Sequence, residues 1–320
     1  MLHFIVNIRG GSGKAFLKWN KVQKILKDRN IEHKVHVTQH AGHASQIARE
    51  LSLSGDEDLR LVVVGGDGAL NEVINGIGAN KKGEADISNF SKVKIGLIPT
   101  GSGNDFSRGM EIPRHSPEKA LDIILNAGEG RKIDLGKATV LDDGKNDSSL
   151  FAISSGFGLD AIVGTGINTA KIKKILNFMH LGKLSYGLYT VQTLFTMKTY
   201  SVKMKFDGEE AKSFKKMIFL ANMNFGAEGG GVPMNNEARG DDGELSMCMA
   251  HGVPKILTFF FFPFLLFGAQ KHLPGFLMRN YKTLEIESDK PSVLHTDGEF
   301  RGNVRHVKWE VLPGAMTFLA

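Results

Sequence analysis

One stretch of the chain limits its fold more than any other: an apolar run that ends in glycines and continues as a helix. Residues 61–64 are Leu-Val-Val-Val, an uninterrupted apolar segment typical of a strand buried on both faces. Gly65-Gly66-Asp67-Gly68 follows directly, and residues 69–77 then carry apolar side chains at helical spacing. A strand that passes through a tight glycine turn into a helix predicts a β-α unit of a parallel sheet.

The first third of the chain repeats this alternation. Strands are expected at residues 2–7, 35–38, 61–64 and 95–98, and helices from about residue 14 and at 43–53, 69–77 and 117–127. Right-handed crossovers bring every strand-to-helix loop to the same edge of a parallel sheet. The glycine-rich loops after residues 7, 64 and 98 should therefore meet at one crevice.

After about residue 132 the pattern changes to a period of two. Val202, Met204 and Phe206 alternate with lysines, and residues 245–249 and 284–287 alternate in the same way. This favours antiparallel strands, with one helical interruption at about 170–197. At roughly 100–200 residues per domain, a chain of 320 residues suits two domains. We expect a parallel-sheet α/β domain at residues 1–132 and an antiparallel β-rich domain at 133–320.

Composition limits the cellular compartments and the binding partners that suit this chain. A single cysteine, Cys248, cannot close an intrachain disulfide, which favours a reducing cytoplasm and a structural thiol. The N-terminus lacks the basic flank and cleavage site of a signal peptide, and the longest apolar run, 256–267, is too short to span a bilayer. The net charge of +6 suits nucleotides or an anionic membrane. Because the basic residues are scattered, we expect no nucleic-acid partner.

The turn at residues 65–68 has the chemistry of a phosphate cradle. Glycines allow close approach of the backbone, and the helix N-terminus behind them offers N–H groups to phosphate oxygens. Asp67 could hold Mg²⁺ or orient a transferring phosphate, although Gly-Asp-Gly alone also suits a simple tight turn. Two standard nucleotide-binding motifs do not match the sequence. The dinucleotide fingerprint requires a glycine where the chain has Asn71, and the P-loop requires a glycine at Ile8 and a hydroxyl residue at Ala15.

A third loop, Pro99–Phe106, follows the strand expected at 95–98. Its sequence is Pro-Thr-Gly-Ser-Gly-Asn-Asp-Phe. By itself this loop could be a flexible turn that caps a short helix near Asn104. Convergence of three such loops on one sheet edge favours a ligand site instead.

These motifs resemble a known family. Residues 65–76 and 99–106 are similar to the two signatures of the diacylglycerol kinase catalytic domain family, which includes soluble bacterial lipid kinases, sphingosine kinases and ceramide kinases, and more distantly NAD kinase. The similarity extends to Asn7, to Thr38, and to Asp297-Gly298-Glu299, and so covers nearly the whole chain. It implies an ATP-binding α/β domain and a β-rich lipid-substrate domain whose last strand returns to the first, with ATP and a lipid hydroxyl meeting between them.

The resemblance also implies roles for individual residues. Glu299 would be the general base, with Asp67 as a second catalytic residue. The residues that would contact ATP are Asn7, Gly11, Lys14, Thr38, Gly65, Gly66, Asp67, Gly68, Ala69, Leu70, Asn71, Thr100, Asn104 and Asp105. A structural Mg²⁺ site is implied around Arg239, Asp242 and Glu244.

Three positions depart from the family pattern. Ile8 replaces a usual proline, Ala69 replaces a threonine, and Glu244 replaces an apolar residue. The departure at Ala69 removes one hydroxyl contact to phosphate.

The predicted activity is an ATP- and Mg²⁺-dependent lipid kinase that phosphorylates a primary hydroxyl of diacylglycerol or a related lipid. Glu299 lies in a turn, from which it can project into a cleft. Without the resemblance, the sequence would favour a solvated turn carboxylate with no catalytic role. The alternatives are an NAD kinase and a catalytically silent lipid- or nucleotide-binding regulator. We expect a cytoplasmic protein in peripheral contact with the membrane, and exposed β edges make a homodimer plausible.

Two further segments have open interpretations. The run Phe259–Phe267 is either a buried core segment or a lipid-facing surface. In the second case, Lys255, Lys271, His272 and Arg279 would meet anionic headgroups. The histidines at 33, 36, 40 and 43 do not share one face, which favours surface or core roles over a zinc site.

Overall fold

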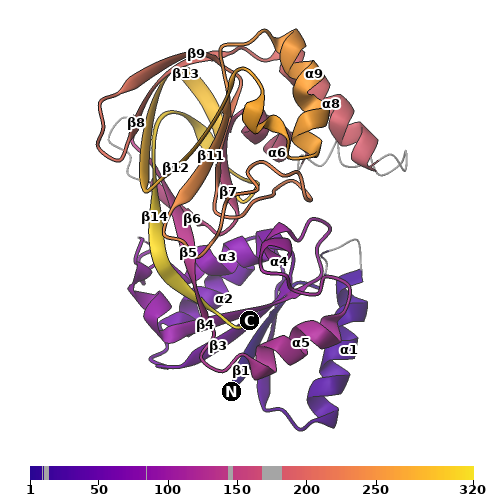
Figure 1. The fold of residues 1–320 in the computed structure, drawn as a ribbon. Coiled ribbons are helices and arrows are strands. Elements are labelled where there is room, and N and C mark those ends of the chain that lie inside the picture. Colours follow the sequence, from indigo (N-terminus) through magenta and orange to yellow (C-terminus); the bar gives the residue numbers. More distant parts are fainter. Residues whose placement is uncertain (9, 11–13, 84, 143–146, 168–181) are drawn as a thin grey trace.

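The N-terminal half is a parallel sheet with helices on its faces (Figure 1). The structure is a computed structural model that describes residues 1–320 except 9, 11–13, 84, 143–146 and 168–181. The strands are β1 (Leu2–Val6), β2 (His33–Val37), β3 (Leu59–Gly65) and β4 (Val93–Pro99), paired in the order β2-β1-β3-β4. The helices are α1 (Lys14–Asp28), α2 (His43–Ser52), α3 (Asp67–Ile77), η2 (Ile87–Lys92), α4 (Asp105–Gly109) and α5 (Pro117–Asn126). The predicted α/β domain is confirmed.

The segment on which the prediction was based folds as expected. Every residue of β3 except Arg60 is buried, and α3 starts at Asp67, directly after Gly66. The buried face of α3 includes Leu70, Val73 and Ile77, which lie at helical spacing and join the core under the sheet. Helix α2 packs beside α3, and α1 packs beside α5.

The C-terminal half is antiparallel. Its strands are β5 (Arg131–Val140), β6 (Asp147–Phe151), β7 (Ser154–Gly158), β8 (Tyr200–Phe206), β9 (Lys212–Met217), β10 (Phe219–Met223), β11 (Leu245–Ala250), β12 (Phe276–Tyr281), β13 (Thr283–Thr296) and β14 (Glu299–Phe318). The main order is β12-β11-β10-β7-β13-β14. In β8, buried and exposed residues alternate strictly, as the period of two predicts.

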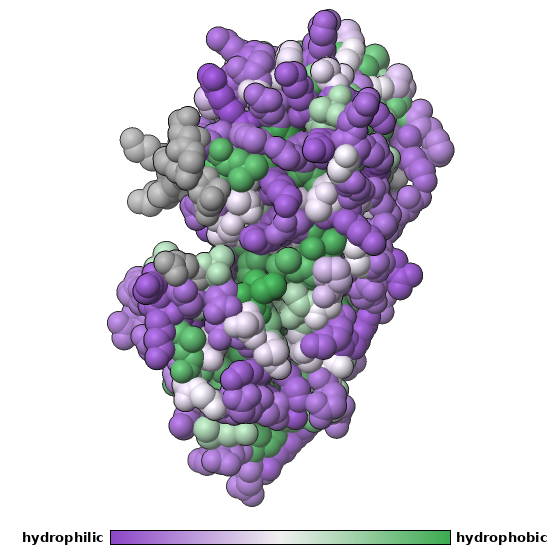
Figure 2. Space-filling view, turned by 90° about the vertical axis from the view of Figure 1, so that its left-hand side faces the viewer, coloured by the Kyte–Doolittle hydropathy of each residue, from purple (hydrophilic) through white to green (hydrophobic). Residues whose placement is uncertain are grey.

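Strand β14 joins the two halves. It pairs antiparallel with β13 and β5, and its last residues, Thr317 and Phe318, pair parallel with Lys94 and Ile95 of β4. The last strand therefore returns to the first domain, as expected, and one continuous sheet runs through both. Figure 2 shows the waist between the two lobes, where apolar residues gather.

In the part of the C-terminal half that the structure describes, there are three longer helices and a short one. They are α6 (Leu159–Ile167), α8 (Gly182–Thr196), α9 (Lys255–Leu266) and η4 (Gln270–His272). The helix expected at about 170–197 corresponds in part to α8, while residues 168–181 lie outside the described part of the chain. None of the helices among the described residues is long and apolar enough to cross a bilayer.

The interpretation of Phe259–Phe267 as a buried core segment is wrong. The run forms most of α9, in which only Thr258 and Leu265 are buried. Phe260 is 62% exposed and Phe267, at the end of the helix, is 83% exposed. The reason is that α9 lies on the outside of the C-terminal lobe (Figure 1). Helix α8 packs against one side of it, and most of its apolar side chains stay exposed on the other.

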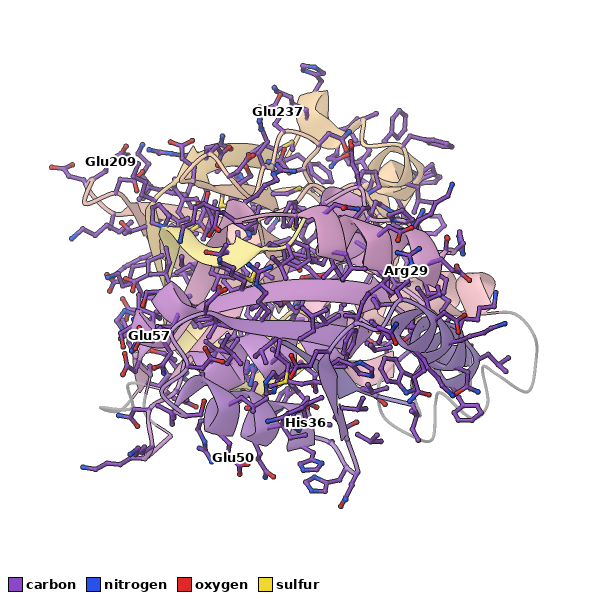
Figure 3. The ribbon with its side chains drawn as sticks, turned by 90° about the horizontal axis from the view of Figure 1, so that it is seen from below. Arg29, His36, Glu50, Glu57, Glu209 and Glu237 are labelled. Atoms are coloured by element: carbon purple, nitrogen blue, oxygen red, sulfur yellow. The ribbon has the colours of Figure 1, made fainter. Side chains whose placement is uncertain are left out.

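Charged side chains lie mostly on the periphery. Seen from below, Arg29, Glu50 and Glu57 surround the parallel sheet (Figure 3). Arg29 pairs with Asp122 at 2.6 Å, and Glu57 pairs with Lys92 at 2.6 Å, in both cases on the surface. Such exposed pairs add little stability. Among the carboxylates of the site described below, Asp105 differs from these because it is buried.

Candidate active site

Two glycine loops meet at the carboxyl edge of the parallel sheet. The Thr100 N–H donates to the Gly65 carbonyl at 2.8 Å, which joins the loop after β3 to the loop after β4. A Cβ atom on Gly66 would lie 2.9 Å from the Gly101 Cα, so only glycines allow the two backbones to touch. Asn7, at the end of β1, donates its N–H to the Val64 carbonyl at 2.9 Å. The loops after β3 and β4 therefore meet at one edge as predicted, beside the end of β1, while residues 9 and 11–13 of the first predicted loop lie outside the described residues.

Asp67 occupies the centre of this edge, at the first residue of α3. Its carboxylate accepts the N–H groups of Asp105 and Phe106 at 3.0 and 3.3 Å. Burial, together with the neighbouring Asp105 and Asp297, raises the pKa of Asp67 to about 6. Asp67 therefore bears a charge that its surroundings only partly compensate.

Asp105 adds a second carboxylate, which is more buried than that of Asp67. It accepts the Gly230 N–H at 2.7 Å and forms an ion pair with Arg108, and burial raises its pKa. A Cβ atom on Gly103 would lie 3.2 Å from an Asp67 oxygen and 3.6 Å from an Asp105 oxygen, so both carboxylates border the same small space. A half-buried and a buried carboxylate, both of raised pKa, suit a hard divalent cation such as Mg²⁺, which would relieve their repulsion.

The C-terminal half supplies the opposite wall through the turn between β13 and β14. Asp297 and Gly298 have φ angles of +50° and +82°, the geometry of a two-residue Asp-Gly hairpin. The Asp297 carboxylate accepts backbone N–H groups from Ala152, Ile153 and Ser154 at 2.8 to 3.0 Å. It also accepts the Asn71 side-chain amide at 2.9 Å, which ties the turn to α3.

This anchoring directs Glu299 at the glycine loop. Glu299 is the first residue of β14 and is exposed. A Cβ atom on Gly68 would lie 3.3 Å from the Glu299 Oε1. The structure thus brings Glu299 beside the loop of Asp67, although 231 positions of sequence (299 minus 68) separate Glu299 from Gly68.

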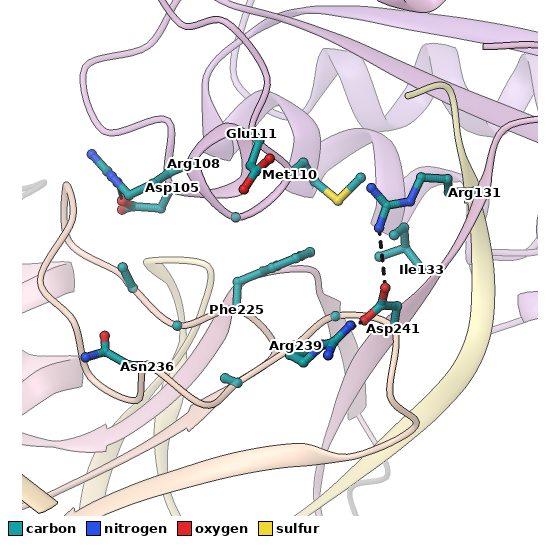
Figure 4. Close-up of a pocket in the computed structure, with 15 residues that line it drawn as sticks. Asp105, Arg108, Met110, Glu111, Arg131, Ile133, Phe225, Asn236, Arg239 and Asp241 are labelled. Carbon is teal, nitrogen blue, oxygen red and sulfur yellow. Dashed lines mark hydrogen bonds and ion pairs between the residues drawn. The ribbon is translucent and has the colours of Figure 1, made fainter.

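A cavity of about 480 Å³ adjoins Asp105 at the junction of the two lobes (Figure 4). Apolar side chains of Met110, Ile133 and Phe225 line part of it. Arg131 pairs with Asp241 at its rim, at 3.3 Å. The cavity places room for a small molecule directly behind one of the two buried carboxylates.

The remaining predicted ATP contacts divide into two groups. Thr100 and Asn104 are buried at the loop, and each carries a side-chain oxygen without a hydrogen-bond partner among the described residues, which suits a contact with a ligand. The Thr38 hydroxyl donates to the Val6 carbonyl at 3.4 Å, next to the end of β1.

The side chains of Leu70 and Asn71 make contacts within the protein instead of facing the loop. Leu70 is buried in the core, and the Asn71 amide is engaged by Leu150 and Asp297, so only their backbone groups face the loop. Ala69 is partly buried against the same core. Gly11 and the side chain of Lys14 lie outside the described residues.

The predicted metal loop has a different organisation from the one the sequence suggested. The Arg239 side chain pairs with Asp241 at 3.4 Å, and Asp242 accepts the N–H of Glu244 at 3.1 Å. Asp134, which the sequence argument did not single out, accepts the N–H groups of Gly243 and Gly314 at 2.7 and 2.6 Å and so holds this loop against β14. The magnesium site here stays a prediction.

Sequence analysis missed three further residues around the Glu299 turn. Arg301 donates to Asn71 at 2.9 Å and to Thr296 at 2.7 Å, and burial lowers its pKa. His295 and Asp160 lie 2.8 Å apart behind the turn. Proximity to Glu299 in sequence could have drawn attention to Arg301, but no local signal marks Asp160. Cys248 is buried in β11, and burial raises its pKa to about 12, as suits a structural thiol.

Comparison with known proteins agrees with this geometry. Residues 1–138 match the family model described as diacylglycerol kinase catalytic domain, and residues 154–320 match the model described as YegS C-terminal NAD kinase beta sandwich-like domain. A diacylglycerol kinase of Staphylococcus carnosus is 27% identical over 302 residues, which cover 92% of this chain and 87% of that protein. A diacylglycerol kinase of Bacillus subtilis is 31% identical over 214 residues, which cover 66% of this chain and 62% of that protein.

A solved structure shares the fold. The crystal structure of a diacylglycerol kinase from Bacillus anthracis superposes with a TM-score of 0.72 at 22% identity, covering 99% of this chain and 96% of that one. The two family models together span most of the residues that form the parallel sheet, the glycine loops and the Glu299 turn. The chain therefore belongs to the lipid kinase family that joins a diacylglycerol kinase catalytic domain to a YegS-like C-terminal domain.

Proposed function

We propose that this protein transfers the γ-phosphoryl group of ATP to the primary hydroxyl of diacylglycerol or a related lipid. One observation carries the proposal: the Glu299 carboxylate lies at the glycine loop, with Oε1 3.3 Å from the position of a Cβ on Gly68. Phosphoryl transfer needs a base that accepts the proton of the attacking hydroxyl close to the phosphate. Glu299 has an exposed carboxylate at this point, and we assign it that role.

The glycine loop is suited to the nucleotide phosphates. The N-terminus of α3, a helix of 11 residues, points its first N–H groups at the space above Gly66 and Gly68. Ala69 has no hydroxyl to offer there, so backbone N–H groups would contact the phosphate oxygens instead. Asp67 and Asp105 would hold Mg²⁺, which when bound neutralises phosphate charge. The unpartnered oxygens of Thr100 and Asn104 remain available to the nucleotide.

We also propose that α9 contacts the lipid surface that holds the substrate. Its exposed apolar side chains include Ile256, Phe260, Phe264 and Leu266, with Phe267 at its end. Such an exposed cluster is expected at a membrane or partner contact. The cations suggested for headgroup binding contribute less, since Lys255 bonds the Phe195 and Met197 carbonyls, Lys271 pairs with Glu237 and Arg279 pairs with Glu209. The apolar face rather than charge supports this proposal.

A labelled-phosphate assay tests the proposed activity. Purified protein is incubated with γ-labelled ATP, with and without Mg²⁺, and with mixed micelles that contain diacylglycerol, monoacylglycerol, a sphingoid base or undecaprenol. We expect one class of lipid to be labelled, and only with Mg²⁺. NADP⁺ formation from NAD⁺ without labelled lipid would instead identify an NAD kinase. Absence of turnover with every acceptor, in a protein that binds ATP, would identify a silent regulator.

A further inference from the structure

A buried hydrogen-bonded chain lies directly behind the turn that carries Glu299. His295, near the end of β13, is 3% exposed. Its Nε2 lies 2.8 Å from the Asp160 Oδ2, at the start of α6. Its Nδ1 accepts the backbone N–H of Gly298 at 3.1 Å. The chain Asp160, His295, Gly298 thus ends on the backbone N–H of Gly298, the residue before Glu299.

The hydrogen bonds define the protonation of the ring. A backbone N–H can only donate, so the Nδ1 that faces Gly298 must carry a lone pair. The ring proton is therefore on Nε2, where the Asp160 carboxylate accepts it. A carboxylate that selects the tautomer of a histidine in this way also fixes the orientation of the ring.

Glu228 completes the surroundings of this pair. Ligating atoms of Asp160, Glu228 and His295 all lie within 4.8 Å of one another. Burial and the charge of Asp160 raise the pKa of Glu228 well above its ordinary value. A shift in this direction favours the neutral form of Glu228, which lessens its repulsion with the Asp160 carboxylate that faces Nε2.

The same cluster is poorly suited to a metal ion. An ion on Nε2 would require the proton to move to Nδ1, where it would face the Gly298 N–H at 3.1 Å. Two donors would then oppose each other inside the protein. The arrangement of donors and acceptors matches a hydrogen-bonded chain instead.

We propose that His295, oriented by Asp160, is a positioning residue for Glu299. It holds the Gly298 peptide, while Asp297 holds the other side of the turn through its three backbone N–H partners. With both sides fixed, the exposed Glu299 carboxylate is held beside the glycine loop. This inference rests on the proposed kinase function, in which Glu299 takes the proton of the lipid hydroxyl.

Two substitutions at His295 separate positioning from packing. In His295→Asn, the amide oxygen takes the place of Nδ1 and still accepts the Gly298 N–H, although the link to Asp160 is lost. In His295→Gln, the amide nitrogen takes the place of Nε2 and still donates to Asp160, although the acceptor for Gly298 is lost. We expect His295→Gln to lower kcat by roughly ten- to a hundredfold at unchanged KM for ATP, since small misplacement of a reacting group has costs of this size. His295→Asn should stay within about threefold of the wild type.

The matched control is His306, which pairs with Glu285 at 2.6 Å far from the turn. His306→Asn and His306→Gln should both leave kcat unchanged. Equal losses in the two His295 variants, or a larger loss in His295→Asn, would overturn the proposal, because packing alone would then explain the effect.

A second measurement does not depend on activity. Long-range ¹H–¹⁵N NMR of the histidine rings should show His295 with a bare Nδ1 and a protonated Nε2. A proton on Nδ1, or a shift of this ring on titration with Zn²⁺ alone, would contradict the proposal. If the wild type labels no lipid, the proposed function fails, and the ring protonation still decides whether the hydrogen-bonded chain exists.

Discussion

Two Asp-Gly pairs face each other across the site, and they differ in how their charge is compensated. Asp67 begins α3 after a parallel strand and accepts two backbone N–H groups. Asp297 sits in a hairpin and accepts three, together with the Asn71 amide. A buried carboxylate with a full set of protein donors holds structure together, whereas one with fewer donors has capacity for a ligand. We therefore infer that Asp297 holds the hairpin turn in place and that Asp67 is free to bind a ligand, with Glu299 between them.

The largest effect is expected at Glu299. Glu299→Gln should lower kcat by about 10²- to 10⁴-fold, because loss of a general base has effects of this size. Folding and ATP affinity should be retained, since the side chain is exposed. Steady-state kinetics and ATP calorimetry measure the two quantities. Glu287→Gln, an exposed glutamate on β13, is the control, and wild-type kcat in Glu299→Gln would remove this residue from the mechanism.

The architectural role of Asp297 predicts a loss of stability. Asp297→Ala leaves three backbone donors and the Asn71 amide without their acceptor, which should lower the free energy of unfolding by about 3 kcal/mol. Urea denaturation followed by circular dichroism measures it. Asp289→Ala removes a carboxylate that accepts one exposed N–H, from Ser201 at 2.9 Å, and should cost less than about 1 kcal/mol. Equal costs would mean that Asp297 is not an anchor.

Substitution of Asp67 should have the opposite sign. Its folded pKa of about 6 lies above the ordinary 3.8, so the native state binds the proton more tightly. Stability from this group is therefore lost as pH rises from about 4 to 6, and the whole penalty applies at neutral pH. Asp67→Asn should raise the free energy of unfolding by about 1–2 kcal/mol at pH 7.5 and by about a third of that at pH 4.5, while turnover falls. Thermal unfolding at the two pH values checks this, and destabilisation at both would show that Asp67 is structural like Asp297.

The smallest effect is expected far from both turns. Phe260→Ser/Phe267→Ser should weaken sedimentation with phospholipid vesicles by about tenfold, since each exposed ring contributes part of its transfer free energy at an interface. The stability contributions of Asp67 and Asp297 should be unaffected. Phe16→Ser/Leu17→Ser, which removes exposed apolar residues of α1, is the matched control. Equal vesicle binding by all three proteins would exclude α9 as the contact.

The features that could be predicted from the sequence are those that depend on interactions between residues a few positions apart. Residues 61–77 are specified by neighbours a few positions apart, so the strand, the turn and the helix were all predicted correctly. The position of Phe259–Phe267 depended on what covers a helix, and apolar composition alone does not decide this. His295 and Asp160 are 135 positions apart, and neither belongs to a local motif. Their partnership exists only because β13 and α6 pack together.

The sequence by itself determined that the first lobe is a parallel α/β unit with glycine loops at one edge, because strand, helix and turn preferences act over short distances. Tertiary structure alone decided how many hydrogen-bond donors each of these carboxylates receives. Asp67 and Asp297 stand in similar Asp-Gly pairs, yet the three N–H donors that satisfy Asp297 come from residues 152–154, brought there by the pairing of β7 with β13. Compensation of a buried charge depends on what folding places within hydrogen-bond distance, which local sequence does not encode.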